Sequence, residues 1–128
     1  MNLPENLFYT ESHEWIRKEN GHVVVGVTDF AQQELTDIVF VELPEVGREL
    51  AAGEACCVVE STKVAADIYA PVAGTVVEVN SELNDHPDWV NQFPYENGWL
   101  FRMTLADEGD LSKLLSGEAY TQILKEKE

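Results

Sequence analysis

Positive charge is scarce in this chain of 128 residues. Lysine and arginine together number 8, against 24 aspartate and glutamate residues, so the formal net charge is −16. A protein that binds nucleic acid or an anionic membrane surface needs a basic patch that neutralises phosphate groups. The composition therefore predicts neither nucleic acid nor membrane among the partners of this protein.

The sequence also lacks segments that would direct it to a membrane or across one. No apolar run reaches the length of about 20 residues that a membrane-spanning helix requires. The N-terminal sequence MNLPENLFYT has neither the basic and apolar regions of a secretory signal nor the arginine-rich composition of a mitochondrial one. We expect a cytoplasmic protein, with the mitochondrial matrix as the alternative only for a processed mature chain.

Residues that commonly bind metals or act as nucleophiles are few and scattered. Cys56 and Cys57 are adjacent, and because neighbours on a strand point to opposite faces, a disulfide between them would be strained. The histidines His13, His22 and His86 have no metal-binding spacing, and no motif of nucleophilic catalysis accompanies them. These absences predict that the protein has no metal site and is not an enzyme.

Most of the chain has the pattern of short β-strands. Runs of β-branched and aromatic residues are separated by Gly, Pro, Asn and Asp, without a linker or a low-complexity segment. This pattern predicts a mainly β sandwich or barrel that forms one domain over residues 1–128. The predicted strands are residues 22–27, 38–43, 55–60, 64–70, 75–79 and 99–105.

Two PxxG motifs, at residues 44–47 and 71–74, each follow a predicted strand. Proline fixes φ and glycine tolerates a left-handed conformation, so each motif predicts a reversal between two strands. The repetition favours a duplicated β-unit with approximate two-fold symmetry. A further turn is predicted around residues 88–91, after Pro87.

Two segments have helical spacing of apolar residues. Residues 28–35 begin with Thr28 and Asp29, which are candidates for the N-cap. Residues 110–125 predict a C-terminal helix that Gly117 breaks into two shorter ones.

Lys63 is the only lysine between Lys18 and Lys113, and it lies between two predicted strands. The small polar residues Ser61 and Thr62 precede it, which suits a tight turn with the lysine at or beside its tip. A side chain at the tip of a hairpin points away from the body and is open to a modifying enzyme. The position indicates a site of covalent modification, although an ordinary surface lysine has the same pattern.

The sequence around Lys63 reads ESTK at residues 60–63 and DIYAPVAG at residues 67–74. It closely resembles the lipoylation site of the H-protein family of the glycine cleavage system. Thr62 and Val64 depart from the Val and Ala more often expected beside the lysine, but they keep the size and turn character. Further blocks extend the resemblance over nearly the whole chain: YTESHEW at 9–15, GVTDFAQQELTDIVFVELPEVG at 26–47, VNQFPYENGWLFRMTLAD at 90–107, and LLSGEAYTQIL near the C-terminus.

The resemblance implies a lipoyl-domain-like barrel-sandwich hybrid with short appended helices, acting as a monomeric carrier without catalysis of its own. It implies lipoic acid joined to the Lys63 amine through an amide, by a lipoate ligase or lipoyl transferase. The arm would take an aminomethyl group from a pyridoxal-phosphate-dependent glycine decarboxylase. It would deliver that group to a tetrahydrofolate-dependent aminomethyltransferase, and dihydrolipoamide dehydrogenase would reoxidise it.

The resemblance also implies a cleft that shelters the loaded arm. The residues that match the family's cleft positions are Ser12, Glu14 and Asp67. An aminomethyl group is cationic near neutral pH, so two carboxylates and a hydroxyl would form a charge-assisted receptor for it.

Other carriers fit the residues around Lys63 less well. Lipoyl domains of 2-oxo-acid dehydrogenases usually have Asp-Lys-Ala and further domains, and biotin carriers place Met on both sides of the lysine. Two alternatives stay open: an H-like donor that relays lipoyl groups to other complexes, and an unmodified β-sandwich interaction module. Replacing Lys63 would leave only the interaction module unaffected.

Overall fold

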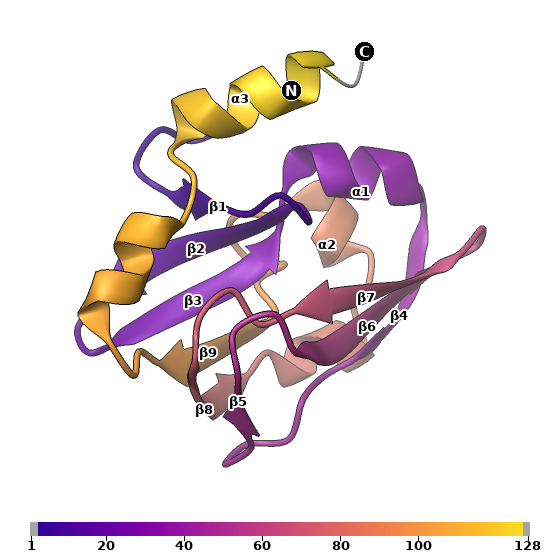
Figure 1. Ribbon diagram of the computed structural model, residues 1–128. Helices are drawn as coiled ribbons and strands as arrows, with labels where there is room; N and C mark the ends of the chain where they lie inside the picture. Colours follow the sequence, from indigo (N-terminus) through magenta and orange to yellow (C-terminus); the bar gives the residue numbers. More distant parts are fainter. Residues whose placement is uncertain (1–2, 127–128) are drawn as a thin grey trace.

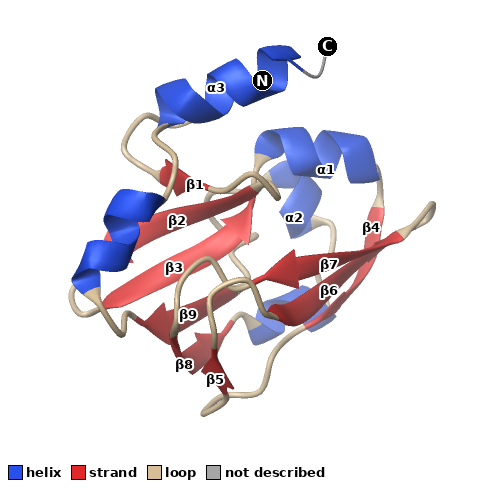
Figure 2. Ribbon diagram, viewed as in Figure 1, coloured by secondary structure: helices blue, strands red, loops and turns tan. Residues whose placement is uncertain are grey.

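The structure is a computed structural model that describes residues 3–126. Its strands form two antiparallel sheets, drawn in Figures 1 and 2. The strands are β1 (Phe8–Tyr9), β2 (Glu14–Glu19), β3 (His22–Val27), β4 (Ile38–Glu42), β5 (Glu49–Leu50), β6 (Ala55–Ser61), β7 (Ala65–Tyr69), β8 (Gly74–Val79) and β9 (Phe101–Thr104). The larger sheet has the order β1-β2-β3-β9-β8-β5 and the smaller one β4-β6-β7, which confirms the predicted fold class.

Helices cover the ends and one face of this β-structure. They are α1 (Asp29–Leu35), α2 (Trp89–Gln92), α3 (Gly117–Glu126) and the 3₁₀ helices η1 (Ser81–Asn84) and η2 (Glu108–Lys113). Thr28 is the N-cap of α1, as predicted, and its hydroxyl accepts a hydrogen bond from the amide of Ala31 at 3.2 Å. The C-terminal pattern forms two helices, but Gly117 begins α3, because the break falls at residues 114–116, where Leu115 pairs with Tyr9.

Two groups of buried side chains hold the layers together. Val23, Val25 and Val27 of β3 face the core between the sheets, whereas Val24 faces a second core under α3. Because both faces of β3 are buried after the exposed His22, its sequence is apolar from Val23 to Val27 and does not alternate. The second core contains the stacked rings of Tyr9 and Tyr120, whose centroids are 4.8 Å apart.

Each PxxG motif lies between two strands, as predicted, but the two strands that it joins belong to different sheets. Residues 44–47 join β4 to β5 and residues 71–74 join β7 to β8, so each motif carries the chain from the smaller sheet to the larger one. Gly74 opens β8, where a Cβ atom would clash with the carbonyl oxygen of Thr104. The two connections occupy equivalent places, and the two-fold duplication stays a prediction.

Candidate functional site

Lys63 lies at the tip of the hairpin formed by β6 and β7, which projects from the body of the molecule at the right of Figure 1. The hydroxyl of Ser61 shapes the turn, since it accepts hydrogen bonds from the amides of Lys63 at 3.1 Å and Val64 at 3.0 Å. Ser61 and Val64 also close the turn through a backbone hydrogen bond of 2.8 Å. The exposed tip agrees with the sequence prediction for this segment.

The amine of Lys63 lies against the last turn of α1. Its Nζ atom donates a hydrogen bond to the carbonyl oxygen of Glu34 at 3.1 Å. Carbonyl groups in the last turn of a helix lack intrahelical partners and carry partial negative charge, so they attract an ammonium group. This contact places the tip of the lysine beside Glu34, at the rim of a cleft.

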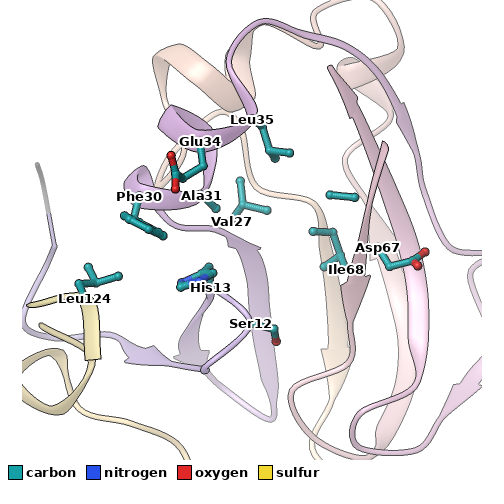
Figure 3. A pocket seen from close by; sticks show the side chains of 11 residues that line it. Ser12, His13, Val27, Phe30, Ala31, Glu34, Leu35, Asp67, Ile68 and Leu124 are labelled. Carbon is teal, nitrogen blue, oxygen red and sulfur yellow. The ribbon is translucent and has the colours of Figure 1, made fainter. Parts of the chain in front are cut away.

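The cleft has a volume of about 460 Å³ and lies between α1 and β7 (Figure 3). Ala66 and Ile68 line it from β7, and α1 contributes the aromatic ring of Phe30. Most of the lining is apolar, which suits a hydrocarbon chain better than a sugar or a phosphate. The lining residues are Ser12, His13, Val27, Phe30, Ala31, Glu34, Leu35, Ala66, Asp67, Ile68 and Leu124.

Glu14 lies beside the cleft and is only 1% exposed. Its carboxylate accepts hydrogen bonds from the hydroxyls of Ser12 at 2.7 Å and Thr10 at 2.5 Å, and a weak one from the amide of Tyr69 at 3.4 Å. Burial raises the pKa of Glu14 above its ordinary value, and these three hydrogen bonds oppose that effect. Within residues 3–126, no lysine or arginine forms an ion pair with it, so Glu14 is a buried acid without a cationic partner.

Asp67, the third predicted receptor residue, is placed differently. It lies on β7 at the edge of the cleft, and its exposed carboxylate points away from His13 and Phe30 in Figure 3. In the part of the chain that the structure describes, no hydrogen bond joins this carboxylate to Ser12 or Glu14. The structure therefore brings Ser12 and Glu14 together and leaves Asp67 apart from them, at the edge of the cleft.

His13 belongs to the cleft, although the sequence analysis gave it no role. Its φ of +72° is unusual for a residue other than glycine, and its ring lies 4.7 Å from that of Phe30, measured between centroids. The Nδ1 atom is hydrogen bonded to the hydroxyl of Tyr120 at 2.8 Å, which ties the cleft to α3. In the sequence, the only sign that His13 belongs to the cleft is its position between Ser12 and Glu14.

The described residues offer no metal site, no membrane-spanning helix and no reactive thiol. Among them no group of His, Cys, Asp and Glu side chains could hold a metal ion, and no helix is both long and apolar enough to span a membrane. Cys56 and Cys57 are free and buried, and burial raises the pKa of Cys56 to about 12. Both thiols stay protonated at neutral pH, as buried structural cysteines do.

Comparison with known proteins gives one consistent result. The family model described as glycine cleavage H-protein matches residues 7–127. The chain is 54% identical over 125 residues to a glycine cleavage system H protein of Thermus thermophilus, covering 98% of each chain. It is 53% identical to that of Halothermothrix orenii over the full length of both. A crystal structure of such a protein from Mycobacterium marinum superposes with a TM-score of 0.88 at 40% identity, covering 95% of this chain and 98% of the other.

Proposed function

Because this chain belongs to the glycine cleavage H-protein family, the lipoyl carriers of the glycine cleavage system, we propose that Lys63 is the residue that carries the lipoyl group. The observation that supports this most directly is the place of its amine, at the hairpin tip and at the rim of the apolar cleft. Attachment forms an amide between the carboxyl carbon of an activated lipoate and Nζ. Overall, lipoic acid and the lysine amine lose one water, and the lysine loses its charge.

The cleft between α1 and β7 has the right chemistry for the arm that attachment would create. A lipoyl group supplies a disulfide that opens to accept an aminomethyl group and is later reoxidised. Val27, Phe30 and Ile68 offer apolar surface to the hydrocarbon part of such an arm. These side chains would exclude water from an arm bound in the cleft, and so would protect an aminomethyl cargo from hydrolysis.

Glu14 and Ser12 would form the receptor for the cationic amine of the cargo. A buried carboxylate without a cationic partner is costly, and a bound ammonium group would neutralise it. The Ser12 hydroxyl, 2.7 Å from the Glu14 carboxylate, holds that carboxylate in place and offers an oxygen to the same cation. Asp67, exposed at the edge of the cleft, would add negative charge near the receptor.

The chain would act as a component that hands its cargo between enzymes, with no side chain performing catalysis. Its partners would be glycine decarboxylase, aminomethyltransferase and dihydrolipoamide dehydrogenase, together with the enzyme that attaches lipoate. The net charge of −16 would draw it towards basic surfaces on these partners. Tethering the cargo to the carrier keeps it at a high effective concentration near each of them.

The proposal is tested by intact mass measurement after incubation of the protein with lipoate, ATP and a lipoate ligase, followed by peptide mapping. We expect one addition, equal to lipoic acid less one water, on the peptide that contains Lys63. Lys63→Arg should abolish it, whereas Lys113→Arg, which changes an exposed lysine paired with Asp110, should not. An unmodified wild-type protein beside a modified reference carrier would refute the assignment of Lys63.

A further inference from the structure

The side chain of Asn91, in α2, holds the segment that connects α1 to β4. Its Oδ1 atom accepts a hydrogen bond from the amide of Ile38 at 2.9 Å, at the first residue of β4. Its Nδ2 group donates to the carbonyl oxygen of Thr36 at 2.8 Å and to the side-chain oxygen of Gln32 at 3.1 Å. One amide thus fixes the end of α1, the linker and the start of β4, more than 50 residues away in the sequence.

The linker that Asn91 fixes has an unfavourable backbone conformation. Thr36, the C-cap of α1, has φ 67° and ψ −148°, a region that glycine adopts and β-branched residues avoid. Such a conformation persists only where the surroundings hold it. The hydrogen bond from Asn91 to the Thr36 carbonyl supplies part of that constraint.

The same linker contacts the hairpin that carries Lys63. The carbonyl oxygen of Asp37 accepts a hydrogen bond from the amide of Thr62 at 3.0 Å, and the carbonyl oxygen of Glu34 accepts one from the Lys63 amine at 3.1 Å. Residues 34–37 therefore bind the hairpin tip at two places. Because α1 and β7 are the two walls of the cleft, these contacts also set the distance between the walls.

We infer that Asn91 is a positioning residue for the modified lysine: by fixing residues 34–37, it determines where the hairpin tip and the walls of the cleft lie. The inference rests on the proposed role of Lys63. Asn91 touches neither Lys63 nor the cleft, so its effect passes through the Thr36 and Asp37 carbonyl groups. A merely structural amide would stabilise the whole fold and would not act selectively on the hairpin tip.

The test compares Asn91→Ala with Asn80→Ala in the unmodified protein, by amide hydrogen exchange resolved by residue. Asn80 is a matched control, because its side-chain amide likewise donates two hydrogen bonds, here to the backbone carbonyls of Asn97 and Trp99, and neither acceptor belongs to α1 or to residues 36–38. We expect exchange at Thr62 to accelerate about tenfold in Asn91→Ala, the loss of roughly one hydrogen bond, without a matching change in β3 and β9. Asn80→Ala should leave Thr62 unchanged relative to those strands.

Asn91→Asp provides a second variant in case the alanine protein does not fold. Its carboxylate still accepts from Ile38 but cannot donate to Thr36, so exchange at Thr62 should accelerate less than in Asn91→Ala, and exchange at Ile38 should not change. With a lipoate ligase, KM for either variant should rise about fivefold with kcat within about twofold, since the hairpin is displaced and the amine is unchanged.

Unchanged exchange at Thr62 in both Asn91 variants would overturn the inference, as would the same change in Asn80→Ala. A wild-type protein that an active ligase does not modify would instead overturn the assignment of Lys63. The exchange measurement uses unmodified protein, so it would still decide whether Asn91 positions the hairpin.

Discussion

Glu14→Gln is expected to stabilise the folded chain while it removes the negative charge of the proposed cation receptor. The glutamine oxygen still accepts from the hydroxyls of Thr10 and Ser12, so these two hydrogen bonds survive. The bond from the Tyr69 amide, at 3.4 Å, is near the upper limit of a hydrogen bond, and losing it costs less than about 1 kcal/mol. Removing a buried charge without a cationic partner gains more, so we expect a net stabilisation of about 1 kcal/mol at pH 7.

The pH dependence of this effect has a definite sign. Burial holds the pKa of Glu14 above its ordinary value of 4.5, so the unfolded chain releases this proton more readily than the folded one. The contribution of Glu14 to stability therefore falls as the pH rises from 4.5 through the raised pKa of the folded state. Glutamine does not titrate, so the advantage of the variant should be largest above that window and vanish below pH 4.5.

Urea denaturation of both proteins between pH 4 and pH 8 measures this difference directly, and contributions from the other carboxylates cancel in it. At pH 7 the melting temperature of the variant should be about 4 °C higher. Asp67→Asn is the control, because Asp67 is exposed and its replacement should change stability by less than about 0.5 kcal/mol. A variant that is less stable at pH 7, or a difference that does not depend on pH, would refute the account of Glu14 as an uncompensated buried acid.

Two further substitutions test the backbone around the cleft and between the sheets. Thr36→Gly should raise the free energy of unfolding by about 1 kcal/mol, because glycine adopts φ 67° without strain. Thr62→Gly, at a position without positive φ, should lower the free energy of unfolding. Equal effects of the two substitutions would contradict the conclusion that the backbone of Thr36 is strained. Gly74→Ala should cost about 3 kcal/mol, because the new Cβ atom meets the backbone carbonyl of Thr104. Gly109→Ala, where the nearest atom is the flexible Asp107 carboxylate at 3.2 Å, should cost less than about 1 kcal/mol in the same urea titration, and a similar loss in both would count against the Gly74 contact.

The sequence predicts the strands that have a clear apolar run and misses those that do not. β2 reads EWIRKE and ends in three charged residues. The sequence does not predict it, because Arg17 and Glu19 are partly exposed at one end of the strand while Trp15 and Ile16 are fully buried. The guanidinium of Arg17 packs over the ring of Trp15, 5.3 Å from its centroid, which accommodates the charge on the sheet. β1 and β5 have two residues each, too few for any periodic pattern.

The candidate site also has one part that the sequence predicts and one part that it does not. The turn at Lys63 is local, since Ser61 and Val64 close it, so neighbouring residues suffice to predict it. The cleft depends on the packing of α1 against β7, which no local pattern specifies, and His13, Phe30 and Glu34 therefore became visible only in the structure. The direction of the Asp67 side chain depends on the register of β6 and β7, which is shifted by a bulge between Ala55 and Cys57.

The pairing of Tyr9 with Leu115 brings a segment near the start of the chain beside a segment near its end. The two residues exchange backbone hydrogen bonds of 2.8 Å, and α3 begins two residues later, on the side of the molecule away from the hairpin tip in Figure 1. A linker between the two termini that keeps α3, together with an opening at the exposed turn of residues 45–48, would leave the residues that line the cleft unchanged, Leu124 of α3 included. The order of the segments along the chain is thus incidental to carrying cargo, and a circularly permuted or end-anchored carrier would still present Lys63 freely.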